Sequence, residues 1–123
     1  MPPLKPTPKR GDVVLVVFPN SDLRTAKLRP ALVVQVDDLG TGLSQTIVAM
    51  ITSKLARAAH PSRVTILLST TEGKLSGLLT DSVVMTDNLA TIALPTIDRV
   101  IGTLPMPLVD NALQHTLGLQ VSR

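Results

Sequence analysis

Apolar residues in this chain gather in short runs, and turn-forming residues end each run. The run at residues 13–18 is followed directly by Pro19, and the run that begins at Ala31 ends before Asp37 and Asp38. Short runs of β-branched and aliphatic residues bounded in this way indicate buried strands. The pattern therefore favours a small fold that is made mainly of β-strands.

Reading all runs in this way predicts five strands, at residues 13–18, 31–36, 46–53, 63–69 and 80–86, and one further short strand at 99–102. Residues 19–29 are polar and predict a long loop, 54–62 a loop or a short helix, and 72–77 a turn. The last segment, from Pro107, predicts a helix that stops at Gly118, because its apolar residues recur at the spacing of one helix face: Val109, Ala112, Leu113 and Leu117. The fold class is α+β, mainly β, a small barrel or sandwich with a C-terminal helix.

The chain is long enough for one domain and apolar enough to build its core. It has 123 residues, of which 44% are hydrophobic and 17% are charged. We predict a single domain over residues 11–123, preceded by a flexible, Pro-rich tail at 1–10. A net charge of +3 is compatible with a phosphate-rich partner. No apolar run reaches the ~18 residues that cross a bilayer, and the N-terminus does not read as a secretory signal, so we expect a cytoplasmic protein and no membrane.

Composition also limits the chemistry. The chain has no cysteine and only two histidines, His60 and His115, which removes disulfides, thiolate nucleophiles and Cys-based zinc sites and disfavours a His-rich metal site. We therefore expect no metal and no cofactor. Neither histidine has a carboxylate partner visible in the sequence, and we assign neither a catalytic role. With Phe18 as its single aromatic residue, the chain cannot bind nucleic acid on stacked aromatic rings.

Three local patterns, in this order, resemble one family. The first is GDVVLVVFP at 11–19 followed by KLRPALVV at 27–34, the second is IVAMITS at 47–53, and the third is GLLTDSVVMTDNLATI at 77–92 followed by VIGTLP at 100–105. Together they are similar to the PemK/MazF toxins of bacterial type II toxin–antitoxin systems. The resemblance extends from about Gly11 to Leu117.

This resemblance implies an SH3-like small barrel of the PemK/CcdB kind with a C-terminal helix, in a homodimer. It implies a metal-independent, sequence-specific endoribonuclease that cleaves single-stranded RNA (mRNA), with a cognate antitoxin as protein partner. A non-catalytic protein of the same fold stays open as the alternative, either directed at DNA gyrase as in the CcdB group or an inactive binder of antitoxin or RNA. A plain SH3-like interaction module is disfavoured, because such domains line their peptide groove with aromatic residues.

The resemblance also implies which residues are catalytic. Arg29, in the Arg-Pro pair, would stabilise negative charge on the phosphorus, since a guanidinium can hold two phosphate oxygens. Thr52 would bond a phosphate oxygen through its hydroxyl, and Asp87 would act as general base. One position departs from the family pattern Val-Val-Arg-x-Asp, because Met85 stands where the pattern has arginine. Whether this form is active stays open.

Further residues are predicted to contact RNA. Arg24 and Lys27 lie with Arg29 in the polar loop, which carries only Asp22 against them, and such a basic loop could close over RNA. A solvated loop without this role is the alternative. Ser53 and Lys54 follow Thr52 directly and could reach a phosphate, and Asp81 could lie near RNA or simply form a turn.

Overall fold

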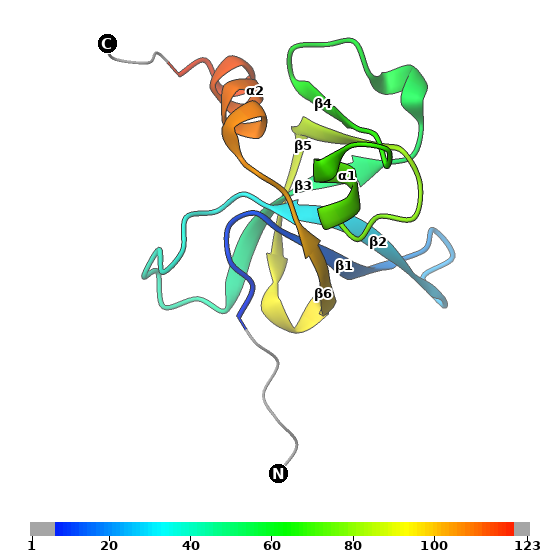
Figure 1. The fold of residues 1–123 in the computed structure, drawn as a ribbon. Coiled ribbons are helices and arrows are strands. Elements are labelled where there is room, and N and C mark those ends of the chain that lie inside the picture. Colours follow the sequence, from blue (N-terminus) through cyan, green and yellow to red (C-terminus); the bar gives the residue numbers. More distant parts are fainter. Residues whose placement is uncertain (1–6, 120–123) are drawn as a thin grey trace.

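The structure, a computed structural model, describes residues 7–119. Six strands form one antiparallel sheet in the order β4-β5-β3-β2-β1-β6 (Figure 1). The strands are β1 (Asp12–Pro19), β2 (Ala26–Val33), β3 (Gln45–Thr52), β4 (Arg63–Ile66), β5 (Ser82–Ala93) and β6 (Ile97–Thr103). The helices are α1 (Thr71–Leu75) and α2 (Pro107–Leu117), and the 3₁₀ turns are η1 (Leu55–Arg57) and η2 (Leu94–Thr96). The predicted class, mainly β with a C-terminal helix, is confirmed.

Aliphatic residues on both faces of the sheet build the core. Because side chains alternate along a strand, Val13 and Leu32 enter one cluster and their neighbours Val14 and Ala31 enter the other. Val109 of α2 belongs to the first cluster, since α2 packs against β4 and β5. The alternation explains how a chain with one aromatic residue still fills its interior.

The predicted loop at 19–29 is partly wrong, because β2 already begins at Ala26. Its first four residues pair with the end of β1, Phe18 opposite Lys27, and form a two-stranded arm that leaves the body of the sheet (Figure 1). Residues 26–29 are exposed, so they have no buried face and no alternation of apolar and polar side chains. That alternation is the signal that identifies a strand in a sequence. At its other end β2 stops at Val33 rather than at 36.

The prediction for β5 ends too early. It stops at residue 86, whereas the strand continues to Ala93. Met85 pairs with Met50, and Leu89 pairs with Ala49, the residue just before Met50 on the antiparallel strand β3. Residues 86–88 therefore have no partner on β3. This is a β-bulge, and bulges redirect side chains. The interruption of the apolar run at Thr86 therefore marks a bulge and not a strand end.

The turn predicted at 72–77 is also wrong in kind, since residues 71–75 form the short helix α1. The Thr70 hydroxyl accepts a hydrogen bond from the Gly73 amide at 3.1 Å and caps the helix. Gly77 follows with a φ of +72°, and a Cβ there would lie 2.0 Å from the Ile101 carbonyl oxygen. Only glycine allows the chain to approach β6 so closely. The short helix considered for 54–62 is present as η1.

Residue 10 is attached to the body of the fold, although we predicted a tail at 1–10. The Arg10 Nε donates to the Val34 carbonyl at 2.9 Å, and its guanidinium pairs with Asp110 of α2. The Arg10 amide donates to the Asp37 carboxylate at 2.7 Å. Residues 1–6 of the predicted tail lie outside the described residues. Within residues 7–119, no helix is long and apolar enough to span a bilayer.

Candidate active site

Arg29 and Thr52 lie on the adjacent strands β2 and β3, near the end of their pairing. Ala31 of β2 pairs with Met50 of β3. Arg29 lies two residues before Ala31 and Thr52 two residues after Met50, so both lie just beyond the last pair that joins β2 to β3. Both lie on the sheet face of the cluster that contains Ala31 and Val48. The sheet therefore brings together the two residues that the family resemblance singled out.

Both side chains can donate hydrogen bonds to an anion. Arg29 is exposed, and its guanidinium makes no hydrogen bond or ion pair with residues 7–119. The Thr52 hydroxyl accepts from the Lys54 amide at 3.2 Å, which uses a lone pair of the oxygen and leaves its hydrogen available. A planar guanidinium and a hydroxyl donor on neighbouring strands are group types suited to hold a phosphate.

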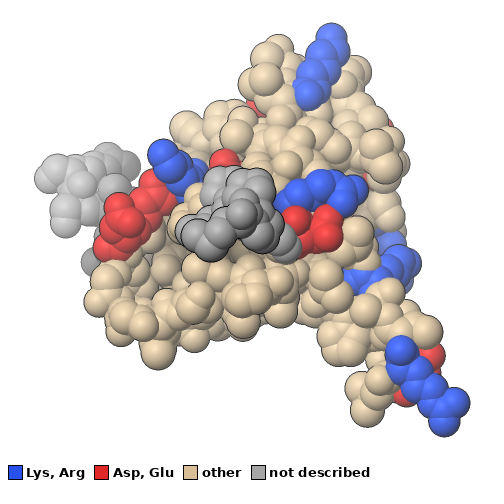
Figure 2. All heavy atoms as spheres, turned by 90° about the horizontal axis from the view of Figure 1, so that it is seen from below, with Lys and Arg blue, Asp and Glu red and all other residues tan. Residues whose placement is uncertain are grey.

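The arm formed by β1 and β2 adds positive charge beside Arg29. The Asp22 carboxylate accepts from the amides of Arg24 at 2.9 Å and Thr25 at 3.1 Å, and these two bonds lower its pKa. Asp22 therefore closes the tip of the arm and forms no ion pair with Arg24 or Lys27. Figure 2 shows the arm projecting from the body, with basic groups on its sides. The polar segment at 20–25 is thus the turn of a hairpin whose tip is held by hydrogen bonds.

The other predicted RNA contacts differ in their surroundings. Ser53 and Lys54 are exposed directly after Thr52, at the edge of the same site. The carboxylate of Asp81, by contrast, accepts a hydrogen bond from the Leu68 amide at 2.7 Å. This bond supports the alternative reading of Asp81 as a turn residue.

Asp87 lies in the bulge of β5 and faces β4. Its carboxylate accepts from the Arg63 Nη2 at 2.9 Å and from the Arg63 Nε at 3.3 Å. The hydrogen bonds from Arg63 lower the pKa of Asp87, because they favour the charged form. A carboxylate with a lowered pKa is a weaker base, so this pairing argues against Asp87 as the general base.

Two arginines from other elements surround Met85, where we noted a missing positive charge. Met85 is 5% exposed and lies opposite Arg63 of β4. Arg57 of η1 places its Nη1 3.9 Å from the Met85 sulfur. Sequence reasoning missed both arginines, because no local pattern in residues 57–63 indicates that they converge on β5.

The two histidines lie together at the surface. Their ring centroids are 6.2 Å apart, and the His60 Nδ1 lies 2.7 Å from the Ser62 hydroxyl. Neither ring has a carboxylate within hydrogen-bonding distance in the part of the chain that the structure describes. The described residues contain no group of three or more His, Asp or Glu side chains that could hold a metal ion.

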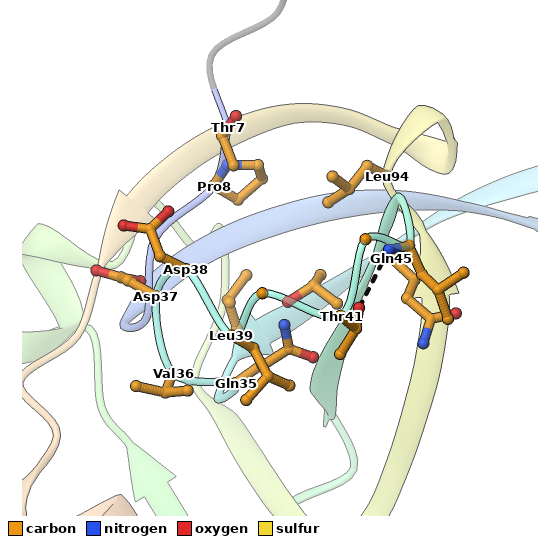
Figure 3. Close-up of a pocket in the computed structure, with 15 residues that line it drawn as sticks. Thr7, Pro8, Gln35, Val36, Asp37, Asp38, Leu39, Thr41, Gln45 and Leu94 are labelled. Atoms are coloured by element: carbon orange, nitrogen blue, oxygen red, sulfur yellow. Dashed lines mark hydrogen bonds between the residues drawn. The ribbon is translucent and has the colours of Figure 1, made fainter.

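A separate pocket of about 320 Å³ lies under the loop that joins β2 to β3 (Figure 3). Its lining is mixed, since Leu39, Leu43 and Leu94 share it with Asp37 and Asp38. In Figure 1 this loop lies on the left, away from the arm on the right. None of the residues predicted for the site lines this pocket.

Comparison with known proteins agrees with the fold. Residues 9–117 match the model of a family described as PemK-like, MazF-like toxin of type II toxin-antitoxin system. This chain belongs to that family. Its relatives include the Endoribonuclease EndoA of Bacillus subtilis (strain 168), which is 35% identical over 116 residues, covering 90% of this chain and 95% of EndoA.

Solved structures of the family share the fold. An endoribonuclease from Mycobacterial species, solved in complex with its cognate antitoxin, superposes with a TM-score of 0.71 at 22% identity and covers 94% of this chain and 100% of its own. The Mycobacterium tuberculosis toxin MazF-mt6 superposes with a TM-score of 0.69 at 24% identity, covering 89% and 99%. The predicted PemK/MazF-like fold is therefore confirmed.

Proposed function

We propose that this toxin is an endoribonuclease that cleaves single-stranded RNA, with mRNA as its substrate, at a short recognition sequence and without a metal ion. The observation that carries the proposal is the exposed guanidinium of Arg29, which has no hydrogen-bond partner among residues 7–119, at the same end of the β2–β3 pairing as the Thr52 hydroxyl. Its 35% identity with an endoribonuclease along most of both chains supports the same conclusion.

The chemistry follows from these two side chains. The 2′-oxygen of the RNA forms a bond to the adjacent phosphorus while its proton passes to water. The bond from phosphorus to the 5′-oxygen breaks, and the 5′-oxygen takes up a proton from water, which leaves a 2′,3′-cyclic phosphate and a 5′-hydroxyl end. Arg29 holds the phosphate oxygens as negative charge builds up on them, and the Thr52 hydroxyl donates to one of these oxygens. Arg29 does not act as base, because a guanidinium keeps its proton at neutral pH. Arg24 and Lys27 attract the neighbouring phosphates from the arm.

The proposal extends to partners and location. A cognate antitoxin would cover the exposed Arg29–Thr52 site and block RNA, and a solved relative in complex with its cognate antitoxin supports such a partner. We further propose a homodimer in the cytoplasm.

The testing experiment incubates the purified protein with a long RNA in EDTA and maps the cut ends. We expect discrete cuts at a short repeated sequence. Arg29→Ala should slow cutting by at least about 100-fold, the effect of losing one donor to a developing oxyanion. Arg99→Ala is the control, since it removes an exposed arginine from the edge strand β6, where it pairs with Asp98 and lies outside the predicted site.

Two outcomes would contradict this assignment. Equal cutting by Arg29→Ala and the wild type would remove Arg29 from the site. Cutting that is lost in EDTA and restored by a divalent ion would contradict the metal-independent reaction.

The pairing of Asp87 with Arg63 favours one second candidate, a non-catalytic toxin of the same fold. With this carboxylate held by an arginine, the predicted general base is weakened. RNA that stays intact but binds the protein, with binding lost in Arg29→Ala, would select this candidate.

A further inference from the structure

The turn η1 lies beside the candidate site. It begins at Leu55, three residues after Thr52, and packs against β5. In Figure 1 the connection from β3 to β4, which contains η1, lies on the same side of the molecule as the arm. Its last residue, Arg57, is exposed.

Arg63 fixes η1 to the sheet. Its Nε and Nη2 donate to the Asp87 carboxylate, and its Nη1 donates to the Arg57 carbonyl oxygen at 2.8 Å. All three nitrogens of this guanidinium therefore have a partner. Arg63 joins β4, the bulge of β5 and η1, and it has little capacity left for a ligand.

The guanidinium of Arg57 is in the opposite situation. Its single hydrogen bond within residues 7–119 is to the Met85 sulfur, which is a weak acceptor and carries no charge. The thioether supports the side chain of Arg57 without neutralising it. A cation is thus held over an apolar surface with most of its donors available.

The position of Arg57 relates it to Arg29 and Thr52. Met85 lies two residues along β5 from Val83, and Val83 pairs with Thr52. Two residues of a strand span about 7 Å, and Val83, Met85 and Thr52 share one sheet face. This span of about 7 Å between the level of Thr52 and the level of Met85 is comparable to the distance between neighbouring phosphates of an extended RNA strand.

We propose that Arg57 is a second phosphate-binding residue of the ribonuclease site, and that it binds the phosphodiester next to the one held by Arg29 and Thr52. Arg63 and Asp87 are positioning residues that hold η1, and thereby Arg57, over Met85. The positive charge that Met85 itself lacks comes from a neighbouring turn. This inference rests on the proposed function and adds a residue and a ligand group to it.

The test measures binding of a fluorescent oligonucleotide that contains the mapped cut sequence, with a 2′-deoxynucleotide in place of the one that supplies the attacking hydroxyl. Kd is determined at several salt concentrations. Arg57→Ala should weaken binding about tenfold and lower the slope of log K against log salt by about 0.7, the value for one phosphate contact on a single strand. Arg57→Lys should keep most of the slope, and Arg99→Ala should keep both Kd and slope.

A double-mutant cycle tests the positioning role. If Asp87 acts through Arg57, then Arg57→Ala should cost much less binding in an Asp87→Asn background than in the wild type. Equal costs in both backgrounds would mean that Asp87 is merely structural. Thermal unfolding of each variant checks that it is folded.

The two proposals fail in different ways. Wild-type protein that neither cuts nor binds long RNA would overturn the proposed function and this inference with it. Wild-type protein that cuts and binds, together with an Arg57→Ala variant of unchanged Kd and salt slope, would overturn the role of Arg57 alone.

Discussion

The arginines near the candidate site differ in whether another residue already accepts their hydrogen bonds. Arg63 and Asp87 bind each other, whereas Arg29 and Arg57 keep guanidinium donors without an acceptor oxygen among residues 7–119. A paired arginine stabilises local geometry, and an unpaired one next to a hydroxyl donor is available to a phosphate. This difference assigns the binding roles to Arg29 and Arg57.

At Thr52 the prediction concerns one hydroxyl. Thr52→Val keeps the shape of the side chain but removes the donor, and we expect RNA cutting to slow by at least about 100-fold. Thr52→Ser should stay within about tenfold of the wild type, because it keeps the hydroxyl. Thr91→Val, at an exposed position of β5, is the control. Initial cutting rates measure all three, and equal rates for Thr52→Val and Thr91→Val would exclude the Thr52 hydroxyl.

At Asp87 the prediction concerns pH. Its pKa in the folded protein lies below the usual value of about 3.9, mainly because Arg63 donates to the carboxylate. Such a group stabilises the fold above its unfolded pKa, and this contribution is lost as the pH falls through the folded pKa. The wild type should therefore be more stable than Asp87→Asn from about pH 5 to 7, and the difference should shrink below about pH 4. Urea unfolding across this range measures it, and a difference that persists unchanged at pH 2 would contradict the ion pair.

Specific contacts between neighbouring segments position the helices α1 and α2 on the sheet. The bulge of β5 turns Asp87 toward β4, and the Thr86 hydroxyl in the same bulge lies 2.7 Å from the Thr116 hydroxyl of α2. Gly77 brings the chain after α1 against β6. These contacts fix α2 and α1 relative to the sheet.

The glycine at 77 gives a prediction at this scale. Gly77→Ala adds a Cβ that would lie 2.0 Å from the Ile101 carbonyl oxygen, so we expect a loss of about 2–5 kcal/mol from overpacking and from the left-handed backbone together. Gly42→Ala is the control, because Gly42 has a similar φ of +77° but open space around it. It should lose only about 1–2 kcal/mol. Equal losses in urea unfolding would show that α1 does not depend on this approach.

The whole molecule depends on one curved sheet with an aliphatic core on each face. No aromatic ring is buried in these two clusters, which are filled by aliphatic side chains. Met106 lies at the border of the first cluster, and Phe18 and Met50 lie at the border of the second. Because the aliphatic side chains are small, the core needs close packing between residues of many strands. A cavity in the centre of the core should therefore lower the free energy of unfolding of the whole domain.

Leu32 tests this dependence. It is 0% exposed, and Leu32→Ala should lower the free energy of unfolding by about 2–5 kcal/mol. Leu28 lies on the same strand and sheet face but is 40% exposed in the arm, so Leu28→Ala should cost clearly less. Chemical denaturation with a single transition would measure both. A small loss at Leu32 would mean that the two clusters are not one cooperative unit.

The sequence determined the features that depend on neighbours along the chain. The runs of Val and Ile predict β1 and β3, and the spacing of Val109 and Ala112 predicts α2, because burial on one face imposes a local period. Arg29 and Thr52 were recognised by family resemblance alone, since neither residue type carries chemistry that its own segment reveals.

Only the tertiary structure decided the surroundings of Met85. Arg57 reaches the Met85 sulfur from η1, and the pairing of β4 with β5 places Arg63 opposite Met85. No pattern in the sequence shows which strand or turn will face a given strand residue. The exposed start of β2 was missed for a related reason, since a strand that buries neither face has no apolar period. Contacts between distant segments depend on register and close backbone approach, and these are properties of the assembled sheet rather than of any segment within it.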